Sequence, residues 1–181
     1  ADGTPVFPNE PLITIKAPII EAQIVETAIL SMINGAMEHA TSARRIIEST
    51  NGKVGVMEFG ARRADGSEAA IDSSIYGIMA GCIGTSNIIA ADMLNIKAMG
   101  TMAHSFIESF PNEYEAFLAY AKAYPDNCIL LVDTVDTLKS GVINAIRVFR
   151  YMKENNMPLD HIGIRIDSGD LAYLSKEARK M

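Results

Sequence analysis

Side chains that could do chemistry stand at the ends of four short apolar runs in this chain. The run at 96–99 leads directly into residues 100–106, which supply a glycine, two hydroxyls and an imidazole. Comparable polar stretches follow the other runs, at 58–63, 133–137 and 165–170. Barrel enzymes carry their active sites at the carboxyl ends of their strands. We therefore expect these four stretches to contribute to one site.

His104 is the strongest nucleophile among these residues. A histidine can accept a proton near neutral pH, and it can also accept a phosphoryl group. We predict that His104 is catalytic, and that its neighbours Thr101 and Ser105 bind substrate. The other two histidines, His39 and His161, have no comparable context, and we interpret them as structural.

Two aspartates follow the third apolar run. Asp133 and Asp136 could hold Mg²⁺ or the hydroxyls of a ribose, because hard cations and polyols both need oxygen atoms close together. Asp136 is better explained as the N-terminal residue of a helix. Asp133 is therefore the stronger candidate, both for catalysis and for binding a metal.

Arg165 and Asp167 are two residues apart in the fourth run, so they should share one face of a strand. The pair is either a structural ion pair or an anchor for a phosphate or a sugar hydroxyl, and the sequence favours neither reading. Asp167 is also a catalytic candidate. Ser168 and Asp170 are more simply explained as residues at the start of a helix.

An aromatic ring and guanidinium groups follow the first run. Phe59 and Arg62 would suit a flat anionic ring, with the phenylalanine stacking on it and the arginine holding its carboxylate. The plainer alternative is a core phenylalanine beside solvated arginines. For Arg63 this plainer alternative is preferred.

Strand and helix patterns alternate through most of the chain and must position these residues. The predicted strands are 54–59, 96–102, 128–133 and 162–167. The predicted helices are 68–80, 86–95, one beginning at Asn112, one with apolar residues from Leu138 to Phe149, and one starting near Leu171. Such alternation implies a parallel sheet with right-handed crossovers. We infer an α/β fold that forms part of an incomplete (β/α) barrel, or one side of an open sheet.

The N-terminal region has a different pattern. We expect an extended arm over 1–11, a half-buried strand over 12–16, and a helix from Ile19 to about Ser49. The domain prediction is a strand and helix of a second α/β domain over 1–50, followed by the first half of the barrel domain over 51–181.

Composition excludes some classes of function. The 181 residues carry a net charge of −6, which gives no electrostatic case for nucleic acid. No apolar run reaches the roughly 18 uncharged residues expected of a membrane span, and no signal peptide is recognisable. We predict a cytoplasmic protein that binds neither nucleic acid nor membrane. Cys82 and Cys128 are interpreted as small buried hydrophobic residues.

Five stretches together resemble the nicotinate phosphoribosyltransferase family. They are EFGARR at 58–63, GTSN at 84–87, GTMAHSF at 100–106, LVDTVDTL at 131–138 and IRIDSGD at 164–170. The resemblance runs in order through most of the chain. It implies a type II phosphoribosyltransferase, with an incomplete barrel and a second domain built from both ends of a longer chain. The present chain would then be an internal fragment, truncated at both ends, and we expect it to be inactive alone.

The resemblance also implies a reaction and roles for individual residues. Phosphoribosyl pyrophosphate and nicotinate would give nicotinate mononucleotide, a precursor of NAD, with ATP as co-substrate, Mg²⁺ as cofactor and a homodimer as the assembly. His104 would be phosphorylated by ATP. Phe59, Arg62 and Ser86 would bind the pyridine ring, where nicotinamide-using relatives are expected to carry an aspartate in place of Ser86. Arg165 and Asp167 would contact the ribose phosphate.

Three alternatives stay open. A nicotinamide phosphoribosyltransferase is disfavoured by Ser86, and a quinolinate phosphoribosyltransferase would call for more basic residues than Arg62 and Arg63. The third alternative is a relative that binds nicotinate without catalysis.

Overall fold

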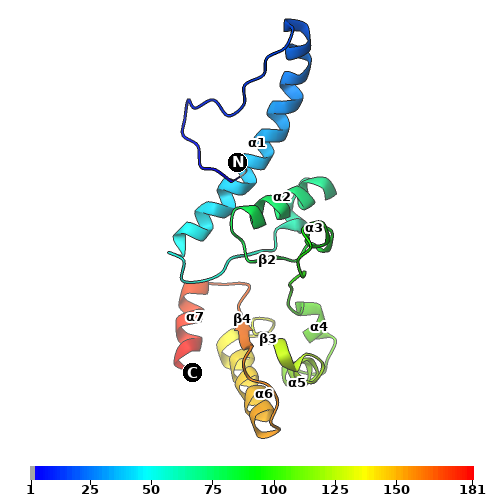
Figure 1. Cartoon of the computed structure of the whole chain (residues 1–181). Helices are drawn as coiled ribbons and strands as arrows, with labels where there is room; N and C mark the ends of the chain where they lie inside the picture. Colours follow the sequence, from blue (N-terminus) through cyan, green and yellow to red (C-terminus); the bar gives the residue numbers. More distant parts are fainter. Residues whose placement is uncertain (1–2) are drawn as a thin grey trace. The chain divides into compact units, whose positions relative to one another are not determined.

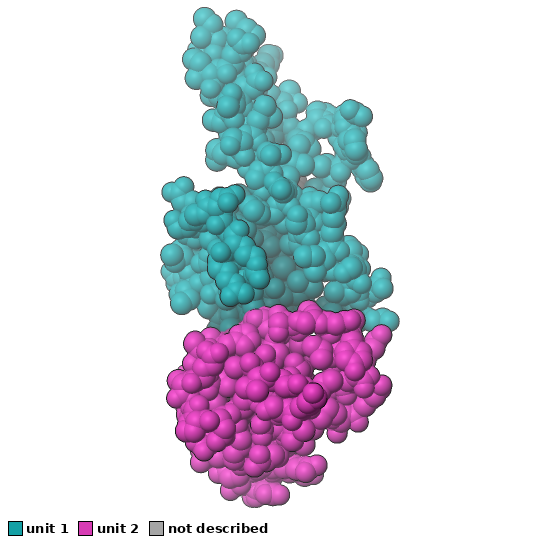
Figure 2. Space-filling view, turned by 180° about the vertical axis from the view of Figure 1, so that it is seen from behind, with its two compact units in different colours: residues 1–100 teal, residues 101–181 magenta. Residues whose placement is uncertain are grey.

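The computed structural model describes residues 3–181. The chain folds into two compact units, Ala1–Gly100 and Thr101–Met181, which Figure 2 draws in different colours. This division falls inside the region that was predicted to be the barrel domain. The predicted boundary between 1–50 and 51–181 therefore stays a prediction.

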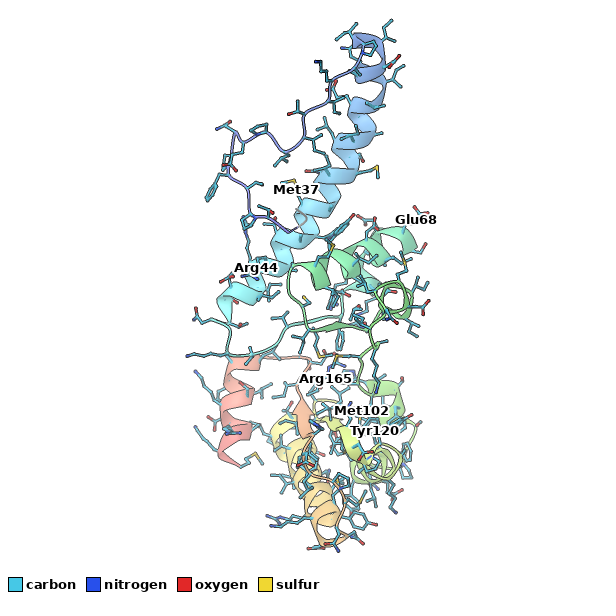
Figure 3. All side chains as sticks on the ribbon, in the orientation of Figure 1. Met37, Arg44, Glu68, Met102, Tyr120 and Arg165 are labelled. Carbon is cyan, nitrogen blue, oxygen red and sulfur yellow. The ribbon has the colours of Figure 1, made fainter. Side chains whose placement is uncertain are left out.

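Unit 1 begins with a long helix, α1 (Ile19–Ser49) (Figure 1). Its bounds are those predicted from apolar periodicity, and Gly35 does not interrupt it. The helix stops because Asn51 and Gly52 both adopt left-handed backbone angles, with φ of 51° and 67°. α1 packs against α2 (Ser67–Met79), where Arg44 donates to the carbonyl of Ala80 at 3.4 Å (Figure 3).

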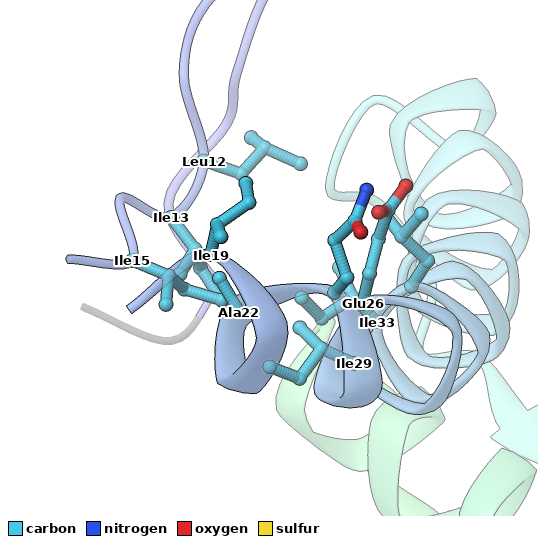
Figure 4. Close-up of a pocket in the computed structure, with 10 residues that line it drawn as sticks. Leu12, Ile13, Ile15, Ile19, Ala22, Glu26, Ile29 and Ile33 are labelled. Atoms are coloured by element: carbon cyan, nitrogen blue, oxygen red, sulfur yellow. The ribbon is translucent and has the colours of Figure 1, made fainter. Parts of the chain in front are cut away.

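The N-terminal half of α1 leaves its apolar side chains exposed. None of the residues of α1 is buried, and a groove between the helix and the preceding arm is lined mostly by apolar residues from Leu12 to Ile33, together with Gln23 and Glu26 (Figure 4). The predicted site residues do not line this groove. By length and composition alone α1 could also cross a membrane. The expectation that no membrane is involved accordingly stays a prediction.

The strand predicted at 12–16 is wrong. These residues are exposed and have no strand assignment, and the described residues provide no neighbouring strand for them. Alternating side chains favour an extended backbone, but a strand exists only where another strand completes its hydrogen bonds.

Two short parallel strands form the centre of unit 1. β1 (Met57–Glu58) pairs with β2 (Gly84–Thr85), with Met57 opposite Gly84 and Glu58 opposite Thr85. α2 lies between them in the sequence, together with η1 (Ala61–Arg63), and α3 (Ile88–Met93) follows β2. The strand predicted at 54–59 is thus shorter than expected, and β2 was not predicted at all.

The strand predicted at 96–102 is also wrong. This segment runs beside β2 and makes one ladder-like hydrogen bond, from the Met99 N–H to the Thr85 carbonyl at 2.9 Å. Since β2 is only two residues long, the pairing cannot extend into a regular strand.

Unit 2 holds the larger core. Its elements are α4 (His104–Glu108), α5 (Glu113–Ala123), η2 (Pro125–Asn127), β3 (Cys128–Leu131), η3 (Thr137–Gly141), α6 (Val142–Glu154), β4 (Ile162–Arg165) and α7 (Leu171–Lys180). The fully buried side chains include Phe117, Leu130, Leu131, Val132, Val148 and Met152. α5 begins as predicted, because the Asn112 side chain accepts the Glu115 N–H at 3.0 Å and donates to the Glu115 carboxylate.

β3 and β4 are parallel, with Leu131 opposite Arg165. The ladder continues one step past the strands, because the Val132 N–H donates to the Arg165 carbonyl at 3.0 Å. Asp133 and Asp167 therefore leave the sheet together at its carboxyl end. The α/β class with parallel strands is confirmed, whereas the described residues form two separate two-stranded sheets, so the barrel stays a prediction.

Both cysteines are buried and free, as predicted. Burial raises the pKa of the Cys128 thiol to about 11, so this side chain behaves as a packing residue at neutral pH.

A π-helical turn, η3, fixes how α6 meets the sheet. Asp136 caps it by accepting the N–H groups of Leu138 and Lys139, which agrees with its predicted place at a helix start. Gly141, the last residue of η3, lies so close to β3 that a β-carbon would stand 1.9 Å from the carbonyl oxygen of Val132. Only glycine permits this approach.

We expect Gly141→Ala to lower the free energy of unfolding by about 1–3 kcal/mol, because the helix or the strand end must move apart. The measurement is urea unfolding of the full-length protein. Gly35→Ala is the control, since its β-carbon would meet nothing within 4 Å and the helix interior favours alanine. Equal stability of the two variants would contradict the prediction.

Candidate active site

The side chain of Asp133 is the centre of a hydrogen-bond cluster in unit 2. It is only 2% exposed. One carboxylate oxygen, Oδ2, accepts the Asp167 N–H at 3.0 Å and the Ser168 hydroxyl at 2.5 Å. The other, Oδ1, lies 3.3 Å from Nε2 of His104. Three segments that are distant in the sequence thereby meet at one carboxylate.

These contacts set the charge of Asp133. Burial disfavours the ionised carboxylate and would by itself raise its pKa. The hydrogen bonds from Ser168, the Asp167 N–H and His104, together with the nearby imidazole, outweigh that effect and lower the pKa below the ordinary aspartate value. Asp133 is consequently an anion at neutral pH.

His104 is the first residue of α4, and its side chain is 39% exposed. The ring nitrogen that faces Asp133 is held by the carboxylate, which orients the imidazole and stabilises it when protonated. The other ring nitrogen is directed away from that carboxylate. Ser105 is the residue after His104 in α4, and it is exposed.

Arg165 links the cluster to Thr101. Its guanidinium group donates to the Thr101 hydroxyl at 2.5 Å and to Oδ1 of Asp167 at 2.5 Å. Arg165 and Asp167 are 27% and 30% exposed, so the pair is open to solvent on one side. The structure therefore contains the ion pair that the sequence suggested. A partly exposed guanidinium held in this way is also preorganised to bind a phosphate.

Phe59, Arg62 and Ser86 belong to unit 1, whereas the other predicted residues belong to unit 2. Phe59 directly follows β1 and Ser86 directly follows β2, so the two residues leave neighbouring parallel strands at the same end. The Ser86 N–H donates to the Glu58 carbonyl at 3.2 Å. Arg62 lies in η1 and is exposed, as is Arg63.

The carboxylates of this cluster could hold Mg²⁺ only together with oxygen ligands from a substrate. The described residues contain no group of three or more His, Cys, Asp or Glu side chains that could hold a metal ion by themselves. Mg²⁺ commonly binds through one or two carboxylates, substrate phosphates and water. Asp133 and Asp167 could supply such carboxylates.

The role of Ser168 in the structure differs from the role that the sequence predicted. Ser168 was interpreted as a helix-start residue, but its hydroxyl donates to Asp133, and Asp170 alone caps α7, accepting the Tyr173 N–H at 2.9 Å. The predicted cap role of Asp170 is confirmed. The Ser168 hydroxyl points to Asp133 because β3 lies beside β4. The residues around Ser168 in the sequence do not indicate this neighbour.

Comparison with known proteins assigns the chain to a protein family. The model of the nicotinate phosphoribosyltransferase (NAPRTase) family matches residues 54–180. The chain belongs to this family. It is 46% identical over 180 residues to a nicotinate phosphoribosyltransferase of Bacillus subtilis, covering 99% of this chain and 36% of that protein. A Mycobacterium tuberculosis nicotinate phosphoribosyltransferase is 44% identical to this chain over 178 residues, and the match covers 98% of this chain and 37% of the Mycobacterium protein.

The fold of this NAPRTase-family chain also matches solved structures. Human nicotinic acid phosphoribosyltransferase superposes with a TM-score of 0.84 at 28% identity, covering 98% of this chain and 44% of the human chain. A nicotinate-nucleotide pyrophosphorylase from Pyrococcus furiosus gives a TM-score of 0.65 at 25% identity, covering 81% of this chain and 37% of that chain. The chain thus spans less than half the length of these relatives. The resemblance read from the five motifs is confirmed as a family assignment.

Asp133 should make stability depend on pH in one direction. A folded-state pKa below the unfolded value stabilises the protein above the unfolded pKa, and this contribution is lost as the pH falls through the folded pKa. We expect Asp133→Asn to lower the free energy of unfolding by about 1–3 kcal/mol at pH 7. The difference from the unaltered protein should shrink below about pH 4.

The measurement is urea unfolding of the full-length protein between pH 7 and pH 3. Asp126→Asn is the control, because Asp126 is exposed and lies at the opposite end of β3. A difference that stays constant across the pH range would contradict this account of Asp133.

Proposed function

We propose that the full-length protein is a nicotinate phosphoribosyltransferase. It would transfer phosphoribosyl from phosphoribosyl pyrophosphate to nicotinate, giving nicotinate mononucleotide and pyrophosphate, with ATP hydrolysis assisting. The observation that carries the proposal is the ionised Asp133 between His104 and the Asp167–Ser168 turn, in a chain of this family.

The charges of unit 2 suit this reaction. Departure of pyrophosphate leaves positive charge on the ribose, which carboxylates of Asp133 and Asp167 stabilise. The leaving group carries negative charge, which Arg165 stabilises while Thr101 holds the guanidinium in place. Ser105 is assigned to substrate binding because it is exposed beside His104.

Mg²⁺ is the proposed cofactor. Asp133 and Asp167 are the residues that would hold it, and it would neutralise the pyrophosphate. The carboxylate that faces His104 would then also belong to the metal site.

His104 is the proposed acceptor of a phosphoryl group from ATP. Asp133 holds one ring nitrogen, so the other is directed away from the carboxylate. The phosphoryl group would add negative charge near Arg165 and its partners Thr101 and Asp167. Its arrival and loss could thereby change the affinity for substrate or product, which would couple ATP hydrolysis to transfer.

The pyridine ring is assigned to Phe59, Arg62 and Ser86. Phenylalanine stacks on the ring, and the exposed guanidinium holds the nicotinate carboxylate. Ser86 follows β2, the strand beside β1, and carries no charge, so it does not repel that carboxylate.

A homodimer in the cytoplasm is the proposed assembly and location.

The assay that tests the function measures mononucleotide formation by the full-length protein. Nicotinate, nicotinamide and quinolinate are each offered with phosphoribosyl pyrophosphate and Mg²⁺, with and without ATP. Conversion of nicotinate, accelerated by ATP, supports the proposal. Conversion of another base instead identifies one of the alternative transferases, and binding of nicotinate without turnover identifies a non-catalytic relative.

His104→Ala should abolish ATP hydrolysis while some ATP-independent transfer persists, because the phosphoryl acceptor is lost and the ribose site is not. The two rates are measured side by side. His161→Ala is the control, since that side chain is exposed at the start of β4. Unchanged ATP hydrolysis in His104→Ala would exclude the phosphohistidine.

Ser86→Asp should raise the KM for nicotinate by about tenfold or more, because a second carboxylate repels the first. Nicotinamide, which is neutral, should lose less or gain. The measurement is the ratio of kcat/KM for the two bases, with Ser86→Asn as the uncharged control. An unchanged ratio would place Ser86 outside the ring pocket.

A further inference from the structure

Unit 1 contains a second carboxylate with a complete set of donors, that of Glu58. It is the last residue of β1. Oε1 accepts the Gly60 N–H at 2.5 Å, and Oε2 accepts the Thr85 hydroxyl at 2.7 Å. The Ser74 hydroxyl lies 2.7 Å from Oε2 and 2.9 Å from the Ala70 carbonyl oxygen, so these two acceptors share its single proton. Ser74 and Thr85 are fully buried. The carboxylate therefore joins β1, α2, β2 and the turn after β1.

Two glycines lie against the Glu58 side chain. A β-carbon at Gly60 would stand 2.9 Å from Oε1, and one at Gly77 would stand 3.2 Å from the Glu58 Cγ. Two glycines thus border the carboxylate and its stem. This arrangement is a fitted site for a glutamate rather than a chance surface contact.

The network continues from Thr85 into the turn that carries Ser86. The Thr85 hydroxyl accepts the Asn87 N–H at 3.0 Å, so its single proton is directed to Glu58. Asn87 in turn donates to the Ala70 carbonyl at 3.1 Å and caps α3 through the Ala90 N–H. The backbone carbonyl of Glu58 accepts the Ser86 N–H.

Both turns that flank the strand ends are consequently tied to one residue. Gly60 sits between Phe59 and Arg62 in the first turn, and Ser86 sits between Thr85 and Asn87 in the second. The backbones of the two turns that carry Phe59 and Ser86 are thus both hydrogen-bonded to Glu58.

We infer that Glu58 is a positioning residue for the pyridine-ring pocket. It sets the separation of Phe59 and Arg62 from Ser86, and so tunes the fit and selectivity for the base without touching it. The assignment of these residues to the ring rests on the proposed function; the coupling of the two turns does not.

Glu58→Gln is the principal variant. The two oxygens of a carboxylate both accept hydrogen bonds, whereas an amide accepts on one side and donates on the other. Glutamine therefore leaves either Gly60 or the two hydroxyls facing a donor. The control is Glu68→Gln, which removes an exposed carboxylate from the first turn of α2 in the same unit.

A second pair of variants keeps the test valid if Glu58→Gln does not fold. Thr85→Val keeps the shape of the side chain and removes the hydroxyl, whereas Thr85→Ser keeps the hydroxyl. Loss of function in Thr85→Val and its retention in Thr85→Ser would follow from the two hydrogen bonds of the hydroxyl, to Glu58 and from the Asn87 N–H, rather than from packing.

The experiment measures steady-state kinetics and amide hydrogen exchange of the full-length protein. In Glu58→Gln and Thr85→Val the KM for nicotinate should rise about tenfold, the size expected when one buried polar partner is lost. The KM for phosphoribosyl pyrophosphate should stay within about twofold. Exchange should become faster in both peptides that contain Gly60 and Ser86, and Thr85→Ser and Glu68→Gln should resemble the unaltered protein.

Several outcomes would overturn the inference. An unchanged KM for nicotinate would show that the turns do not set the ring pocket. An equal rise of both KM values would show a general structural role. Faster exchange at only one turn, or at neither, would show that Glu58 does not couple them.

The exchange measurement also separates this inference from the proposed function. If the unaltered protein converts no pyridine base, the proposed function fails and the role of Glu58 in base recognition fails with it. Faster exchange at both turns would still support the coupling in that case, and unchanged exchange would overturn it.

Discussion

A buried charge is tolerated in a protein only where donors surround it, and Asp133 is such a charge. Its donors come from α4, from the backbone after β4 and from the hydroxyl of Ser168. Because α4, Asp133 and the turn after β4 are far apart in the sequence, the requirement to satisfy one carboxylate organises the carboxyl end of the β3–β4 sheet. The orientation of His104 and the path of the chain into α7 both depend on it.

Unit 1 satisfies the same requirement in the same manner. There the acid is Glu58 at the end of β1, which accepts the Gly60 N–H and the Thr85 hydroxyl and shares the Ser74 hydroxyl proton with the Ala70 carbonyl. In each unit a short parallel pair ends at an acid that ties the following turns together. Because each sheet has only two short strands, few ladder hydrogen bonds reach the turns, and the side-chain acceptors add hydrogen bonds that hold them.

Elements that depend on local interactions agree with the patterns in the sequence, whereas several that depend on contacts between distant segments do not. α1 was predicted with its observed bounds, and α5 with its cap, because apolar periodicity and capping are local. Asp133 and Asp167 were expected together because parallel strands end at one edge. The strands at 12–16 and 96–102 were wrong because alternation does not reveal whether a partner strand is present. The roles of Ser168 and Glu58 depend on contacts between distant segments, which the sequence pattern alone does not specify.

The π-turn before α6 has a consequence for insertions and deletions. In η3 the Gly141 N–H bonds back to the Asp136 carbonyl, five residues earlier, so the turn contains one residue more than an α-helical turn. Deleting one residue here would rotate α6 by about 100° relative to its cap. Val142, Ala145, Val148 and Met152 would then turn away from the core. The length of this short segment is therefore constrained as strictly as the identity of Gly141.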